Sequence, residues 1–345
     1  MRRARPMREG SVLNRILIIR MHAIGDVALT LPCCAALRRE YPNATIDFLT
    51  SENITPLVQA VDLFDEVISF PHCNTRFERI LNTMRMQASL SHRPYQVVLD
   101  LQSNWVSKAL RRRIRPDCWS EFDRQSPLPA GIRTLNAFKD AGFHSLEPVF
   151  DIGVRPALME AAAKLLEEHQ WDPRRKLLLL NPAGLWKTRQ WPDDYFVSLA
   201  QTMTRSDEWQ MLFLGTNRIR PRVNAFRGGF SGNVIDLVEK TDLGIALAVL
   251  QFVNLAISED SGLMHMACAC GVPTLAILGS SRSDWSRPVG MHTKCLHSGD
   301  LPCGSCMKEQ CIYGDIHCLT RHRPEDVLSL LPSLLMNHTH NEITS

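Results

Sequence analysis

Short apolar runs recur along the chain, and each is followed by a stretch whose apolar positions have helical spacing. The first run, Arg15-Ile-Leu-Ile-Ile-Arg20, shows no alternation of polar and apolar positions, which indicates a strand buried on both faces of a parallel sheet. The spacing becomes helical from Asp26 to Glu40. Further strands are expected at 45–50, 66–70 and 96–101, and further helices at 54–61, 76–90 and 104–114. Strands that alternate with helices form right-handed βαβ units, so residues 12–150 are predicted to be one Rossmann-like domain.

A second alternating series begins after a helix rich in Ala, Leu and Glu at 156–170. Strands are expected at 176–181, 210–215, 255–258 and 273–278, with helices at 192–204, 243–252 and 261–270. This series predicts a second Rossmann-like domain over 151–322, followed by a C-terminal helix over 323–337 with Pro324 in its first turn. The predicted fold class is α/β, with two doubly wound domains facing a central cleft. Ligands bind at the carboxyl ends of the strands in such sheets, so the loops after the strands are the places to look for chemistry.

The composition is that of a globular protein. The chain has 345 residues, 45% of them apolar and 22% charged, which suits two domains of ordinary size. No apolar stretch reaches the roughly 18 residues needed to span a bilayer. The apolar run at 16–19 is too short for a signal peptide, so we expect a cytoplasmic protein. A net charge of +3 gives no argument for nucleic acid as a partner.

Basic residues are unevenly distributed. They gather in the tail Arg2-Arg3-Ala4-Arg5 and in a run formed by Lys108, Arg111, Arg112, Arg113 and Arg115. Such a run is typical of a solvated helix face. It also fits attraction to an anionic acceptor or to an anionic membrane surface. In the second interpretation Arg111, Arg112 and Arg113 contact the acceptor, and the protein lies peripherally on the cytoplasmic face of the inner membrane.

One strand-end segment has the pattern of an anion site. In Leu255-Ala-Ile-Ser-Glu-Asp-Ser-Gly-Leu-Met-His265, a buried strand ends in acidic residues and a helix begins at Ser261-Gly262. Free backbone N–H groups at a helix N-terminus attract anions, and Gly262 allows a diphosphate to approach closely. The alternative is that Asp260 and Ser261 form an ordinary N-cap, which both residue types favour.

A second polar loop follows the strand at 176–181. It contains Lys187, Thr188 and Arg189, which are placed to neutralise the charge that grows on a departing diphosphate. A solvated basic loop is the alternative interpretation.

The loop after the first strand, His22-Ala-Ile-Gly-Asp26, lacks the Gly-x-Gly-x-x-Gly spacing of a dinucleotide site, which argues against a dehydrogenase. Asp26 has the chemistry of a general base for an acceptor hydroxyl. The alternative is that it only caps the helix that follows.

Cysteines cluster near the C-terminus. Cys303, Cys306, Cys311 and Cys318 are four thiols within 16 residues, a number that fits tetrahedral zinc or iron. Reduced structural cysteines in a loop are the alternative, because the spacing lacks paired C-x-x-C motifs. Four further cysteines lie on predicted helices and are expected to pack in cores: Cys33, Cys34, Cys268 and Cys270.

Taken together, these segments resemble glycosyltransferase family 9, the ADP-heptose:lipopolysaccharide heptosyltransferases. The matching pieces, in chain order, are Arg15-Ile-Leu-Ile-Ile-Arg20 with Gly25-Asp26 and Leu31-Pro32, Asn181-Pro-Ala-Gly184 with Trp191-Pro192, Ser258-Glu-Asp-Ser-Gly262 with His265, Gly271-Val-Pro273 with Leu278-Gly279, and the cysteine tail with Pro324-Glu325. They extend along nearly the whole chain at spacings like those of the family.

The resemblance implies a GT-B fold and an inverting transfer that requires no metal or other cofactor. It implies a heptose moved from ADP-heptose to a lipid-linked, anionic lipopolysaccharide inner-core acceptor (Kdo/heptose-lipid A). Asp26 matches the base of the family, and Asp260, Ser261, Gly262 and His265 match its donor segment. The lysine that precedes the Trp-Pro pair by two residues in the family is Arg189 here, which keeps the charge but changes the geometry. The nucleotide is expected near Gly215, Thr216 and Thr241.

Two alternatives remain open from the sequence. One is a family member that uses another nucleotide sugar or a protein acceptor. The other is a protein that binds a nucleotide sugar without catalysis.

Overall fold

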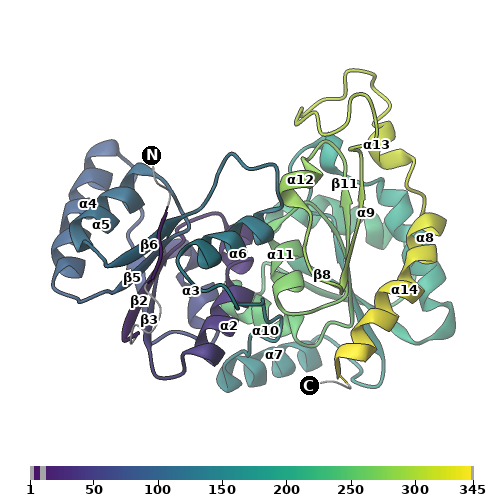
Figure 1. The fold of residues 1–345 in the computed structure, drawn as a ribbon. Helices are drawn as coiled ribbons and strands as arrows, with labels where there is room; N and C mark the ends of the chain where they lie inside the picture. The colour runs from purple at the N-terminus through teal and green to yellow at the C-terminus, as the bar shows by residue number, and fades with distance from the viewer. Residues whose placement is uncertain (1–3, 8–12, 343–345) are drawn as a thin grey trace. The chain divides into compact units, whose positions relative to one another are not determined.

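The chain divides into two compact units, Met1–Arg155 and Pro156–Ser345. A computed structural model describes residues 4–7 and 13–342, so Arg2 and Arg3 of the basic tail lie outside the described residues. Each unit contains one six-stranded sheet with helices packed on it (Figure 1). Among the described residues, no helix is both long and apolar enough to cross a bilayer.

The sheet of the first unit has the strand order β1-β6-β5-β2-β3-β4. Its strands are β1 Ala4–Arg5, β2 Arg15–Ile19, β3 Thr45–Ser51, β4 Glu66–Phe70, β5 Val97–Asp100 and β6 Cys118–Glu121. All neighbours pair in parallel except β1, which runs antiparallel to β6. Its helices are α1 Ile24–Ala28, α2 Leu31–Glu40, α3 Thr55–Gln59, α4 Arg76–Ser91, α5 Trp105–Ile114 and α6 Ala130–Asp140.

The predicted helix from Asp26 to Glu40 is two helices, α1 and α2. The break falls between Ala28 and Leu31, directly before Pro32 in the first turn of α2. Proline has no N–H to donate and its ring clashes with the preceding turn, so it favours a helix start over a helix interior.

The sheet of the second unit is entirely parallel, with the order β12-β11-β10-β7-β8-β9. Its strands are β7 Lys176–Asn181, β8 Trp209–Gly215, β9 Val234–Val238, β10 Leu255–Glu259, β11 Thr274–Leu278 and β12 Thr293–His297. Its helices are α7 Pro156–Glu168, α8 Asp193–Met203, α9 Arg220–Gly229, α10 Leu243–Leu250, α11 Gly262–Ala269, α12 Ser283–Ser286, α13 His317–Thr320 and α14 Pro324–Glu342.

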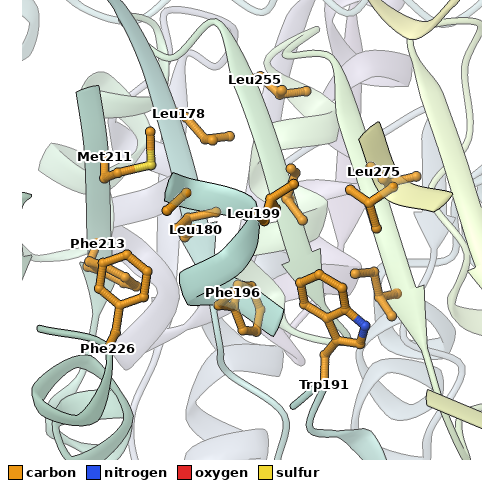
Figure 2. Packing of buried hydrophobic residues seen from close by; sticks show 14 of the residues in the cluster. Leu178, Leu180, Trp191, Phe196, Leu199, Met211, Phe213, Phe226, Leu255 and Leu275 are labelled. Carbon is orange, nitrogen blue, oxygen red and sulfur yellow. The ribbon is translucent and has the colours of Figure 1, made fainter. Parts of the chain in front are cut away.

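The core of the second unit is anchored by Trp191, which is fully buried (Figure 2). Its ring meets Phe196 edge-on, with the ring centroids 4.9 Å apart. Its indole N–H donates to the carbonyl of His322 at 2.7 Å, so the polar tip of this large apolar side chain is satisfied. The end of the loop after β7 is therefore fixed to the core.

Three of the four cysteines expected to pack in cores, Cys33, Cys34 and Cys268, are buried, which confirms that prediction for them, and Cys270 is half-buried. Burial raises the pKa of Cys33 and of Cys268 to about 12, so both remain thiols at neutral pH.

Candidate active site

The opening of α11 has the features of an anion site. Ser261 is the N-cap residue, and its hydroxyl accepts a hydrogen bond from the N–H of Met264 at 3.3 Å. Asn181, the last residue of β7, donates from Nδ2 to the hydroxyls of Ser258 and Ser261 at 2.7 and 2.6 Å. Ser261 is thus an N-cap, as the alternative interpretation held, but it is also held by a neighbouring strand. The positive end of the helix dipole remains directed at the position where an anion would bind.

Arg189 lies beside this opening, as the sequence predicted a cation would. Its guanidinium forms an ion pair with Asp260, with Nη1 and Oδ2 3.1 Å apart, and lies 4.1 Å from the centroid of the Trp186 ring. The hydroxyl of Ser281 donates to the same Asp260 carboxylate. Both members of the ion pair are largely buried, so the position of the guanidinium is fixed before any ligand arrives.

Two neighbours of Arg189 are placed differently. Lys187 is exposed. The hydroxyl of Thr188 is buried, where it donates to the carbonyl of Lys308 and lies 2.9 Å from the Ser280 hydroxyl. His265 is buried in the first turns of α11. The structure therefore brings Arg189, Asp260 and Ser261 together and directs the Thr188 hydroxyl to other partners.

Sequence reasoning missed Glu259, the fully buried last residue of β10. Its carboxylate accepts from the backbone N–H groups of Gly184 and Trp191, both at 2.6 Å, and from Arg222 of α9 at 2.7 and 2.8 Å. Burial raises the pKa of Glu259 to about 7, against the opposing effects of Arg222 and the two N–H groups. These contacts span both ends of the loop that carries Arg189, so Glu259 fixes its shape.

Gly184 shows how tightly that loop is folded. A Cβ atom at this position would lie 2.3 Å from the carbonyl oxygen of Arg189 and 2.9 Å from the Glu259 carboxylate. The nearest neighbour is a backbone carbonyl, which cannot move aside as the end of a side chain could, so only glycine fits.

The three residues expected near the nucleotide lie around the ends of β8 and β9. Gly215 ends β8 and accepts at its carbonyl from the N–H of Glu239 at 2.8 Å, which joins it to the segment directly after β9. Thr216 is exposed and Thr241 is half-buried, and Asp242 caps α10. The structure brings these two loops together.

Asp26 lies in α1, the short helix that follows β2. Its Oδ2 is 2.8 Å from Nη2 of Arg20 and accepts from the N–H of Ala23 at 3.3 Å. The side chain of Arg20 is 5% exposed and packs over Phe122 at 4.5 Å, whereas that of Asp26 is 36% exposed. Asp26 therefore does cap α1, but both contacts fall on one oxygen, and Oδ1 has no partner among the described residues.

The loop after β2 is held in place by Gln102 and lies near two arginines. The carboxamide oxygen of Gln102 accepts from the N–H groups of Met21 and His22 at 2.8 and 3.1 Å. Burial and the positive charges of Arg20 and Arg79 lower the pKa of His22, so this imidazole is neutral at physiological pH.

The basic run on α5 is not a uniform face. Arg111 is buried, lies 3.7 Å from the centroid of the Trp119 ring, and pairs with Glu121. Its side chain is therefore not exposed to an acceptor, contrary to the prediction. Arg112 and Arg113 are exposed, as predicted.

The four C-terminal cysteines line one cavity of about 430 Å³ in the second unit: Cys303, Cys306, Cys311 and Cys318. Within the described part of the chain, no group of three or more His, Cys, Asp or Glu residues is arranged to hold a metal ion, so the zinc or iron interpretation is not supported. Burial raises the pKa of Cys318 to about 11, so this side chain is a thiol at neutral pH.

Comparison with known proteins identifies the family. The model of glycosyltransferase family 9 (heptosyltransferase) matches residues 83–317, more than half of the chain. This chain belongs to glycosyltransferase family 9. It is therefore a glycosyltransferase, and the predicted GT-B fold class is confirmed by its structural neighbours.

Several relatives of this family 9 chain are similar along most of their length. Lipopolysaccharide heptosyltransferase 1 of Pseudomonas aeruginosa is 25% identical over 93% of this chain and 98% of its own. The family 9 glycosyltransferase of Veillonella parvula has a TM-score of 0.81 at 21% identity, covering 96% of this chain and 99% of its own. An Escherichia coli heptosyltransferase solved with ADP-2-deoxy-2-fluoro heptose has a TM-score of 0.62 at 17% identity, covering 92% of this chain and 99% of its own.

Proposed function

We propose that this chain transfers a heptose from ADP-heptose to a lipid-linked, anionic saccharide acceptor of the lipopolysaccharide core, with inversion and without a metal ion. The observation that carries the proposal is the opening of α11, where Arg189 is held by Asp260 beside the N-cap Ser261. A cation fixed next to a helix N-terminus is suited to a diphosphate. The names of the relatives, lipopolysaccharide heptosyltransferases, support the choice of sugar and acceptor.

In this proposal the second unit, Pro156–Ser345, binds the donor. The diphosphate lies at Ser261 and Gly262, with Arg189 and Lys187 as its cationic partners. The nucleoside lies against the joined loops after β8 and β9, near Gly215, Thr216 and Thr241. Thr188 and His265 would act from behind this surface, because both are buried.

The first unit, Met1–Arg155, is proposed to bind the acceptor. Oδ1 of Asp26 takes the proton of the acceptor hydroxyl as that oxygen attacks the anomeric carbon of the donor. The bond from the anomeric carbon to the diphosphate breaks, and its electron pair leaves with ADP. A single displacement of this kind inverts the configuration. The positive charge that a metal would otherwise supply comes from Arg189, Lys187 and the helix N-terminus.

The test is transfer from ADP-heptose to a Kdo-containing lipid A acceptor, with and without EDTA. We expect turnover that EDTA leaves unchanged and a product of inverted anomeric configuration by NMR. Transfer from a different nucleotide sugar alone, or loss of turnover in EDTA that added divalent metal restores, would contradict the proposal. Binding of ADP-heptose without turnover would favour a non-catalytic binding protein.

Replacing Arg189 with Met is expected to weaken ADP binding by roughly 10- to 100-fold, because a charged hydrogen-bond partner of the diphosphate is lost. Methionine keeps most of the side-chain length that packs against Trp186. Isothermal titration calorimetry measures the effect, with Arg174→Met of the same unit as the control, since Arg174 is exposed and pairs with Asp172, two residues away. An unchanged dissociation constant for Arg189→Met would remove this residue from the donor site.

A further inference from the structure

Helix α4 carries a stripe of apolar side chains that the described residues of the first unit, 4–7 and 13–155, leave exposed. Phe77 is 74% exposed, Ile80 42% and Met84 60%. Their spacing of i, i+3 and i+7 puts all three on one face of the helix. We call these three residues the apolar stripe of α4.

The stripe lies opposite the face that α4 packs on its own unit. Thr83 and Leu90 are buried, and Met86 packs against the core beneath the helix. Gln87 donates from Nε2 to the carbonyl of Ala109 at 2.9 Å, which ties α4 to α5, its neighbour in Figure 1. The apolar stripe is therefore not an extension of the core.

Helix α4 is regular and well capped at the end where the stripe begins. The hydroxyl of Thr75 accepts from the N–H of Glu78 at 3.1 Å, and the carboxylate of Glu78 accepts from the N–H of Asn74 at 2.9 Å. With both N-terminal bonds made and 16 residues in the helix, the stripe is a fixed surface.

The charge around the stripe is positive, and most of it is unpaired; Lys108 and Arg111 pair with Glu121. Helices α4 and α5 together hold seven Arg or Lys residues and one acid, Glu78. None of the exposed arginines Arg76, Arg79, Arg85, Arg112 and Arg113 forms an ion pair with a carboxylate in the described ranges 4–7 and 13–342. Some arginines elsewhere in the unit, such as Arg38 with Asp65, do form ion pairs. The positive charge is therefore free to meet an anionic partner.

We propose that α4 is a membrane-docking helix that lies in the headgroup region of an anionic bilayer, with Phe77, Ile80 and Met84 toward the acyl chains. An apolar face flanked by basic residues is the pattern of helices that lie in this interface. Arginines on both sides of the stripe would contact lipid phosphates, and α5 would add Arg112 and Arg113. A protein partner would need an acidic rim around an apolar groove, whereas an anionic bilayer supplies both chemistries over any area.

Docking at α4 would also bring Asp26, the proposed base, close to the lipid surface. Arg79, in the first turn of α4, lies close enough to His22 for its charge to act on the imidazole, and His22 is four residues from Asp26. A lipid-linked acceptor would then reach Asp26 without leaving the bilayer. This consequence rests on the proposed function, but the docking itself does not.

Vesicle flotation without substrate tests the docking. We expect the protein to bind vesicles of equal parts phosphatidylglycerol and phosphatidylcholine, to bind phosphatidylcholine alone weakly, and to be released by about 1 M salt. The double variant Phe77→Ser/Met84→Ser is expected to lose binding to the anionic vesicles by at least about tenfold. The double variant Arg76→Gln/Arg85→Gln is expected to lose roughly 30-fold.

The control variants are Met291→Ser and Arg174→Gln, which change a similarly exposed apolar and a similarly exposed basic side chain of the second unit. Both are expected to bind anionic vesicles like the wild type. Failure of the wild type to bind these vesicles, or wild-type binding by both α4 variants, would overturn the proposal.

Turnover separates this proposal from the proposed function. Both α4 variants are expected to keep wild-type turnover on an acceptor dispersed in detergent and to lose it on the same acceptor embedded in anionic vesicles. Vesicle binding that depends on α4, in a protein that transfers nothing to any acceptor, would sustain the docking helix and reject the proposed function. Transfer with no vesicle binding would do the reverse.

Discussion

Replacing Asp26 with Asn is expected to lower the turnover number by roughly 10²- to 10⁴-fold, the contribution of a well-placed general base. Asparagine has nearly the same shape, and its oxygen still accepts from Arg20 and Ala23, so the helix cap is preserved. What is lost is the ability to take a proton at the oxygen that has no partner within the described structure. Initial rates at saturating ADP-heptose and acceptor measure the effect.

The matched control for Asp26 is Asp151→Asn, which alters an exposed carboxylate of the same unit that pairs with Arg39. Turnover by this variant is expected to equal that of the wild type. ADP binding is expected to be unchanged in both variants, since Asp26 belongs to the other unit. Near-wild-type turnover by Asp26→Asn would leave Asp26 as a helix cap only.

Replacing Arg222 with Met is expected to lower the free energy of unfolding of the second unit by about 3–5 kcal/mol, because it leaves the Glu259 carboxylate buried without a counter-charge. The guanidinium also donates to the carbonyl of Trp191 at 2.7 Å and to Asp193 at 2.6 Å, and both bonds are lost. Chemical denaturation followed by far-UV circular dichroism measures the change. The control Arg174→Met is expected to have no effect, because that arginine is exposed.

The deficit of Arg222→Met is expected to depend on pH. Burial holds the pKa of Glu259 at about 7, above its ordinary value, and loss of Arg222 raises it further. A carboxyl whose pKa is raised by folding contributes stability below its unfolded pKa and loses that contribution as the pH rises through the folded pKa. The deficit should therefore shrink as the pH falls toward about 7, because below the wild-type folded pKa of Glu259 the carboxyl is protonated in both proteins. A deficit that does not change with pH would mean that Glu259 is not the group left uncompensated.

The strands that the sequence missed lie at or next to an edge of a sheet. β2, β7, β10 and β11 are continuous apolar runs because neighbours cover both of their faces and edges. β9 and β12, the edge strands of the second sheet, escaped prediction, and so did β1 and β6 at one side of the first sheet, whereas the edge strand β4 was predicted. All five residues of β12, Thr-Lys-Cys-Leu-His, are half-buried, so their pattern resembles that of a loop. An edge strand needs fewer buried apolar side chains, so its hydrophobic pattern in the sequence is weaker.

The candidate site was predictable where one segment carries the chemistry. Ser261 at a helix start and Arg189 in a strand-end loop could be recognised as candidates from the sequence around each of them. Glu259 and Arg222 could not, because they are 37 residues apart and helix α9, which brings Arg222 back, was not predicted. Helical spacing marked α4 correctly, but it could not tell which apolar face neighbouring elements cover. That distinction depends on packing, which no local pattern contains.

The crowding at Gly184 has a consequence for changing donor preference by directed evolution. Mutations that add a side chain at Gly184, or lengthen the loop, would displace Arg189 and break the hydrogen bond from the Gly184 N–H to Glu259. Most such clones would fail to fold this region. Leu185 and Lys187 protrude from the same loop and are exposed. Libraries that vary these two positions and keep Gly184 fixed would sample new donor contacts on an intact scaffold.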